Sequence, residues 1–137
     1  MSANPSRDNA IVHIPVSIGE LVDKLTILEI KNDEITDTAK LERVRRELSM
    51  LQAEYDKIED AEARIATLRQ DLKSVNRALW TIEDQLRLKE AKQEFDEDFV
   101  SLARSVYRTN DERHHLKTKI DAVLGSALSE AKSYAGT

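Results

Sequence analysis

The sequence predicts an all-α protein: an antiparallel helical bundle that contains one long, coiled-coil-like helical hairpin. Charged residues make up 34% of the 137 residues and aromatic residues only 4%, which is typical of long amphipathic helices around an aliphatic core. The chain has only three glycines and two prolines, which disfavours strands joined by tight turns. Over most of its length apolar residues recur three and four positions apart, which is the period of a helix face.

The length of 137 residues predicts a single domain with one modest core. Residues 1–10 are polar and contain Pro5, so we expect a flexible N-terminal tail followed by one helical domain over residues 11–137. Residues 11–16 form a short apolar segment that we expect to be extended and to pack along the bundle.

The first helix is predicted to begin at Ser17. Ser17 and Glu20 have the spacing of a capping box, and Val16 and Leu21 that of a hydrophobic staple. We expect the helix to end near Thr36. Apolar residues almost surround it, so its polar residues have two interpretations: they pair with each other on a solvent side, or Asp23 or Lys24 faces polar residues of later helices.

Two further apolar patterns follow, one from about Thr38 to Ile58 and one from Ala61 to Leu86. The phase slips between them, which indicates either a stammer in one very long helix or a helical hairpin. We favour the hairpin because Asp60 is placed to cap a new helix. Its tip is expected at about residues 59–73, with solvated charges on its outer faces.

The last long helix is predicted to begin after Asp96, which is a favourable cap, and to end at Gly125. Its connection to the preceding helix is short, so the two helices should pack antiparallel.

Two stripes of polar residues accompany the apolar seams of these last two helices. In the first, Asn76, Trp80, Glu83 and Arg87 are spaced at four, three and four residues, which places them on one helix face. A comparable stripe runs along the last helix from Tyr107 through His114 and Lys117 to Asp121, and Asn110 and Arg113 occupy positions where the apolar period predicts Leu or Val. Charged residues are rarely directed towards a core unless they are paired or used in function. The candidate ligand-binding residues are therefore Asp23, Lys24, Trp80, Glu83, Asp84, Arg87, Asn110, Asp111, Arg113 and Lys117.

These residue types suit several tasks. Arg87 or Arg113 could hold a phosphate or carboxylate in bidentate geometry. Glu83, Asp84 and Asp111 could hold a divalent cation through their oxygens. A carboxylate beside Trp80 could act as a general acid or base. The competing interpretation is a buried salt-bridge network, with Arg113 paired to Glu83 or Asp84, that only fixes the register of the helices.

Composition also excludes some classes. A net charge of −5 disfavours general nucleic-acid binding, and the absence of Cys excludes thiolate metal sites. The sequence shows no signal-peptide core and no apolar run approaching the roughly 18 residues of a membrane span, so a cytoplasmic location is expected. No phosphate loop, nucleophile elbow or zinc motif is present.

Several of these stretches also carry a resemblance. The segments VSIGELVDKLTILEIK (16–31), LWTIEDQLR (79–87), FVSLARSVYRTNDERHHLK (99–117) and LGSALSEAKSY (124–134) resemble a family of small helical proteins of bacteria and phages, described only as a domain of unknown function. A second helical family with a W-x-x-E-D-x-x-R segment is more distantly similar. Both resemblances imply gene neighbourhoods of surface-polysaccharide assembly, and neither implies any catalytic residue.

Two functions remain open from the sequence. One is a small accessory or binding module that recognises a phosphorylated or acidic sugar-type ligand, or a partner enzyme of glycan assembly. The other is an enzyme with a carboxylate-lined site that uses a divalent metal. We also expect a homodimer, because the apolar seams of residues 41–58 and 61–86 are longer than the remaining helices can cover.

Overall fold

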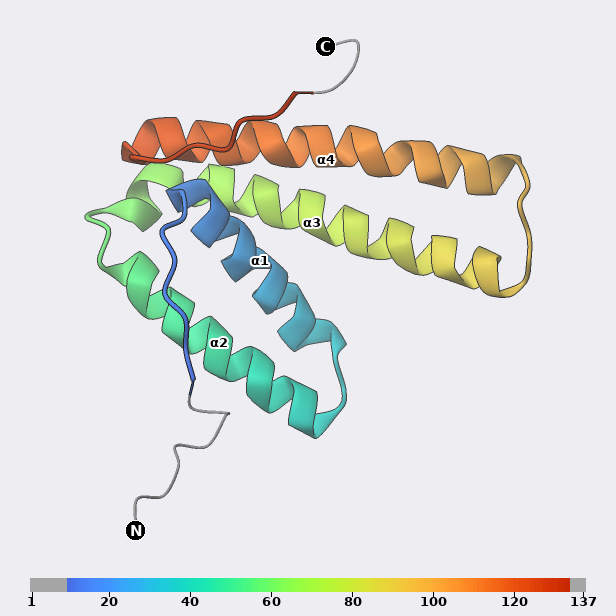
Figure 1. The fold of residues 1–137 in the computed structure, drawn as a ribbon, viewed down its shortest axis with the longest axis horizontal. Helices are drawn as coiled ribbons and strands as arrows, with labels where there is room; N and C mark the ends of the chain where they lie inside the picture. Colours follow the sequence, from blue (N-terminus) through green and yellow to red (C-terminus); the bar gives the residue numbers. More distant parts are fainter. Residues whose placement is uncertain (1–9, 134–137) are drawn as a thin grey trace.

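The computed structural model of the chain describes residues 10–133, which form a bundle of four helices (Figure 1). They are α1 (Ile18–Glu34), α2 (Thr38–Asp56), α3 (Ala61–Ala91) and α4 (Glu97–Leu124). Residues 10–133 contain no strand, so the all-α prediction is confirmed. None of the described helices has the length and apolar content that crossing a membrane requires. Apart from Ala10, the predicted N-terminal tail lies outside the described residues.

Ser17 caps α1 as expected from the sequence, and Asp37 caps α2 in the same way. The hydroxyl of Ser17 accepts a hydrogen bond from the backbone N–H of Glu20 at 3.0 Å, and the carboxylate of Asp37 accepts one from the N–H of Lys40 at 2.9 Å. Helix α1 ends at Glu34, slightly before the expected Thr36. Helix α2 then runs back beside α1, as Figure 1 shows.

A turn at residues 57–60 separates α2 from α3, so the chain forms two helices here and not one long helix with a stammer. Asp60 does not act as predicted: its φ of 53° is left-handed, and its side chain makes no capping hydrogen bond.

Residues 59–73 do not form the predicted solvated tip of a hairpin. Ile65 and Leu72, at 1% and 0% exposure, belong to the core, and α3 kinks at Ile65 (φ −128°) as it enters that core.

The hairpin that projects from the bundle is formed by α3 and α4. Asp96 caps α4: its carboxylate accepts a hydrogen bond from the N–H of Phe99 at 2.9 Å, and the helix then runs back along α3 (Figure 1). It ends at Gly125 in the left-handed conformation (φ 66°), as predicted. The loop end of this hairpin extends past α1 and α2 (Figure 1).

The core lies where α1 and α2 meet the start of α3 and the end of α4. Its buried apolar residues are Val22, Leu25, Tyr55, Ala61, Ile65, Leu72, Ile120 and Leu124. The apolar seam of α2 is therefore covered by α1. This differs from the expectation from the sequence, in which the seam of residues 41–58 was too long to be covered and required a second copy. Exposed apolar side chains occur instead towards the loop end of the α3–α4 hairpin, among them Leu88 at 62% and Val100 at 53% exposure.

Residues 10–16 precede α1 without forming a helix or a strand. The apolar side chains of this segment are exposed rather than packed: Val12 is 85% and Ile14 68% exposed. His13 is exposed as well.

Candidate functional site

A cluster of polar side chains lies where the first half of α1 crosses α3 and α4 and where the C-terminal segment, residues 126–133, returns along α4. We call it the polar cluster; its members are Glu20, Asp23, Asn76, Arg113, Lys117, Asp121 and Glu130.

Asp23 is the buried centre of the polar cluster, with 0% exposure. Its Oδ1 accepts hydrogen bonds from Nδ2 of Asn76 and from Nε of Arg113, each at 2.9 Å, and its Oδ2 accepts a second hydrogen bond from Nη2 of Arg113. Thr26 completes the network: its Oγ1 accepts from Asn76 at 2.9 Å and donates to the carbonyl oxygen of Asp23 at 2.8 Å. Asp23 therefore joins α1 to both helices of the hairpin.

Arg113 binds Asp23 in the bidentate geometry that a guanidinium and a carboxylate favour. The hydrogen bonds to Asp23 raise the pKa of Arg113 despite its partial burial, which acts in the opposite direction. The side chain of Arg113 is 29% exposed and that of Asp23 only 1%, so the pair is closed on the aspartate side and reachable on the arginine side.

Lys117 is the second buried cation of the polar cluster, with a side chain that is 9% exposed. Its Nζ lies 2.6 Å from Oε2 of Glu20 on α1 and 2.9 Å from Oε2 of Glu130 in the C-terminal segment. Burial alone would lower the pKa of Lys117, but the hydrogen bonds to the two carboxylates outweigh it and the pKa is raised. Glu20 was predicted to complete a capping box; its carboxylate instead pairs with Lys117.

The N-terminus of α1 is closed by residues far away in the sequence. The N–H of Ile18 donates to Oγ of Ser126 at 3.0 Å, and the N–H of Gly19 donates to Oδ1 of Asp121 at 2.6 Å. With the Ser17–Glu20 bond, these contacts satisfy first-turn donors that a helix cannot pair internally. A Cβ at Gly19 would collide with the carbonyl oxygen of Lys117 and lie 3.0 Å from Oδ1 of Asp121, so α1 approaches α4 closely because residue 19 has no side chain.

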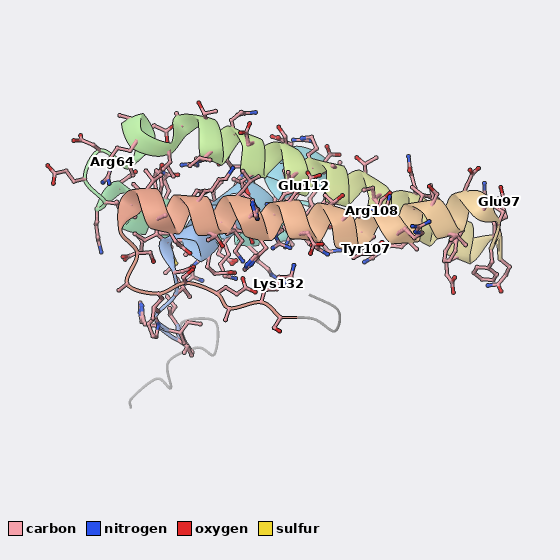
Figure 2. The ribbon with its side chains drawn as sticks, turned by 90° about the horizontal axis from the view of Figure 1, so that it is seen from above. Arg64, Glu97, Tyr107, Arg108, Glu112 and Lys132 are labelled. Carbon is pink, nitrogen blue, oxygen red and sulfur yellow. The ribbon has the colours of Figure 1, made fainter. Side chains whose placement is uncertain are left out.

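The C-terminal segment is held along α4 by its side chains, as the position of Lys132 in Figure 2 shows. Nζ of Lys132 lies 3.2 Å from Oδ1 of Asp111 and 3.5 Å from the carbonyl oxygen of Asn110. The carboxylate of Glu130 lies 4.0 Å from Nδ1 of His114. That Nδ1 is buried, and among residues 10–133 it is the buried side-chain polar atom left without a hydrogen-bond partner. A buried polar atom without a hydrogen-bond partner thus lies at the edge of the polar cluster, beside Glu130.

The structure brings together part of the predicted site. Asp23 faces the polar residues of α3 and α4, as one of the two interpretations expected, and it meets Arg113 close to Lys117. Lys24 is exposed. The expected pairing of Arg113 with Glu83 or Asp84 is replaced by the pairing with Asp23.

The other predicted residues lie outside the polar cluster. Glu83, Asp84 and Arg87 are exposed, and Trp80 is half-buried, farther along α3 towards the loop end of the hairpin. Asn110 contributes only its carbonyl oxygen, to Lys132, and Asp111 pairs with Lys132 on the surface. In the part of the chain that the structure describes, no group of three or more His, Asp or Glu side chains is placed to hold a metal, so the predicted set of Glu83, Asp84 and Asp111 does not form a cation site.

Some members of the polar cluster were not among the predicted residues. Asn76 and Asp121 lie in the two polar stripes, so the spacing already contained a signal for both. Glu20 was predicted to cap its own helix. Glu130 lies in a segment without helical periodicity, so residue spacing could not identify it.

A second polar group surrounds Arg69, in a hollow of about 490 Å³ formed by α1, α2 and α3. Arg69 and Lys73 pair with the two oxygens of Glu29 at 2.6 and 2.8 Å. The guanidinium of Arg69 also lies 4.8 Å from the ring centre of Tyr55, a cation–π distance. Burial would raise the pKa of Glu29, but its hydrogen bonds with Lys73 and Arg69 prevail and lower it. These contacts pair charges of α1 and α3 and add an aromatic ring of α2, and we interpret the group as part of the packing of α1 against α2 and α3.

Comparisons with known proteins supply one finding. Neither the curated proteins nor the solved structures include a match to this chain. A family model described as a family of unknown function (DUF6165) matches residues 12–137, which contain all of the polar cluster. The chain belongs to this family.

Proposed function

We propose that the protein is a small binding module whose polar cluster takes an acidic or phosphorylated sugar-type ligand at Lys117, in the place that Glu130 occupies. The observation that supports this most directly is that Lys117 is held firmly by a helix, whereas its partner Glu130 is not. Lys117 lies on α4 and is 9% exposed, whereas Glu130 lies in a segment without helix or strand and is 53% exposed. A ligand anion can therefore replace the Glu130 carboxylate without unpacking a helix.

The surroundings of Lys117 suit such an exchange. Nδ1 of His114 is buried beside Glu130 and has no hydrogen-bond partner, so a ligand with a hydroxyl or a phosphate oxygen would satisfy it. Glu20 stays bound to Lys117 and the Asp23–Arg113 pair stays closed, so both would position Lys117 rather than contact the anion. Arg113 acts here through the packing of α1 on α4, which differs from the direct clamp that the sequence suggested.

The biological setting is part of the same proposal. The resemblance stated above implies bacterial and phage proteins encoded near genes of surface-polysaccharide assembly, so we propose an accessory role beside a glycan-assembly enzyme in the cytoplasm. We also propose that the protein works as a homodimer. A carboxylate-lined metalloenzyme has less support, since its predicted ligands do not converge within residues 10–133.

Binding can be tested by titration calorimetry with inorganic phosphate, glucose 1-phosphate and glucuronate as probes. Lys117→Met should abolish binding, and Glu130→Gln should strengthen it, because the amide no longer competes with the probe as an anion. Lys24→Met is the matched control: Lys24 lies on α1, is exposed, and belongs to neither the polar cluster nor the α3–α4 contact. The proposal would be overturned if neither wild type nor the Glu130→Gln variant bound any probe, or if the Lys24→Met variant lost as much affinity as the Lys117→Met variant.

A further inference from the structure

The α3–α4 hairpin has an outer face that no other described helix covers. On each helix the residues of this face are spaced alternately three and four apart, so they share one side. Two grooves lie between the helices on this side, with volumes of about 470 and 600 Å³, and both are lined only by residues of α3, α4 and the loop between them. The outer face comprises Asp71, Ser74, Ala78, Thr81, Gln85, Leu88 and Lys92 together with Asp98, Ser101, Ser105, Arg108, Glu112, His115 and Lys119.

Small side chains are frequent between the two ends of the outer face, where Arg108 and Glu112 of α4 are the charged residues. Ser74, Ala78 and Thr81 on α3 and Ser101 and Ser105 on α4 leave room for another helix to approach closely. Leu88 is 62% exposed on the same face, and burying it would be favourable. This surface therefore suits a helical partner with the same kind of face.

A pair of opposite charges lies at each end of the outer face, and the order of the two charges on α3 and α4 is reversed between the ends. At the end near the core, Asp71 of α3 and Lys119 of α4 line the same groove. At the loop end, Lys92 and Asp98 line the other groove. None of these four side chains forms an ion pair with another residue of the range 10–133 within 4.0 Å.

A two-fold axis lying in the plane of the face, perpendicular to the helices, exchanges these two ends. It places α3 against α3 and α4 against α4 of a second copy, each pair antiparallel. Asp71 then meets Lys92 of the other copy, and Asp98 meets Lys119. Such an axis must cross each helix midway between the two residues that it pairs. This midpoint is 81.5 for residues 71 and 92 of α3 and 108.5 for residues 98 and 119 of α4, so a single axis at the level of Thr81 and Arg108 produces both pairings. The two copies of Arg108 near the axis each lie within about one helical turn of the other copy's Glu112.

We propose that the outer face of the α3–α4 hairpin is the homodimer interface, in which two copies form an antiparallel four-helix arrangement about this axis. The inference rests on the proposed homodimer and specifies its surface. It is independent of the ligand, because the polar cluster uses the opposite stripe of α4, which includes His114, Lys117 and Asp121.

The axis can be tested directly because the chain has no cysteine. In the variant Thr81→Cys the two thiols lie across the axis, so mild oxidation should give a covalent dimer. Glu83→Cys is the matched control: it is exposed on the same helix but lies outside the outer face, and it should remain uncrosslinked. Equal crosslinking of the two variants, or none in either, would overturn the interface.

The charge order provides a second test, by analytical ultracentrifugation. Asp71→Lys places two lysines opposite each other at each end and should raise the dimer Kd by about tenfold, while the double variant with Lys92→Asp should restore it. Glu83→Lys is the control of equal charge change and should leave the Kd unaltered. A wild-type chain that sediments as a monomer at about 100 µM would overturn both the homodimer and its interface. A dimer that ignores the charge swap and does not crosslink at residue 81 would overturn the interface alone.

Discussion

At the scale of a single residue, Asp23 shows why removing one member of the polar cluster should lower the stability of the fold. A fully buried carboxylate is strongly unfavourable unless it is paired and hydrogen-bonded. Asn76 and Arg113 supply that pairing from two different helices. The position of α1 on the hairpin is therefore tied to the hydrogen bonds and the ion pair of one side chain.

Arg113→Met should destabilise the protein by about 3–5 kcal/mol, because it leaves the Asp23 carboxylate buried with only Asn76 and no counter-charge. The double variant with Asp23→Asn should recover much of this loss, since a neutral amide carries no buried charge. Chemical denaturation of both variants would measure the difference. Equal stabilities for the single and double variants would show that the Asp23–Arg113 pair is not buried as described.

Gly19→Ala should destabilise the protein by about 1–3 kcal/mol through overpacking, although Ala is the better helix former. The added Cβ meets the backbone of α4 at Lys117, which cannot move aside as a flexible side chain could. Gly125→Ala is a useful comparison: nothing lies within 4 Å of its added Cβ, so its cost, about 1–2 kcal/mol, comes only from the left-handed backbone. Thermal melts with and without the phosphate and sugar probes would separate the two variants. Both should melt at a lower temperature, but only the Gly19 variant should also lose the stabilisation by a probe bound at Lys117.

At the scale of an element, the C-terminal segment is attached to the bundle largely through charged side chains. The hydrogen bond and charge of Lys117 hold the pKa of Glu130 below its ordinary value of 4.5. A carboxyl group with a lowered pKa in the folded state stabilises the attachment above pH 4.5 and loses this effect as the pH falls through the lowered pKa.

Hydrogen exchange should therefore show loosening of residues 126–133 at acidic pH, below 4.5, while α4 itself stays protected. In the Glu130→Gln variant the same segment should be loosely held at all pH values and should lack this transition. Because the Glu130 side chain is more than half exposed, the effect on global stability should be small. An unchanged pH transition in the Glu130→Gln variant would rule out Glu130 as its cause.

At the scale of the whole molecule, the core and the projecting end of the α3–α4 hairpin have different roles. Leu72 is 0% exposed inside the core, and Leu88 is 62% exposed on the outer face of the same helix. Leu72→Ala should cost about 2–5 kcal/mol of unfolding free energy, whereas Leu88→Ala should change it by less than about 0.5 kcal/mol in the monomer. Denaturation at low concentration and sedimentation at high concentration would show the first variant losing stability and the second losing only self-association. A large loss of monomer stability for the Leu88 variant would contradict the assigned exposure.

The sequence by itself determined the elements whose signals are local. Ser17, Asp96 and Gly125 bound their helices as predicted, because each acts on backbone groups within four residues. Asp60 shows the limit of such signals: it has a capping residue type, but the tight turn between α2 and α3 requires a left-handed backbone there, which withdraws its side chain from capping. The helical period likewise identified Arg113 as a charged residue at an apolar position and placed Lys117 in a polar stripe of the same helix.

Only the tertiary structure decided which of these residues meet. Asp23 and Arg113 are 90 residues apart, and nothing in the period of either helix specifies the level at which α1 crosses the hairpin. That level is set by core packing and by the close approach at Gly19, and it places Asp23 opposite Asn76 and Arg113. Glu83, Asp84 and Arg87 lie beyond the crossing and remain in solvent, because α1 is too short to follow α3 to the end of the hairpin. The outer face of that hairpin is exposed for a different reason: α1 packs against the opposite side of α3 and α4.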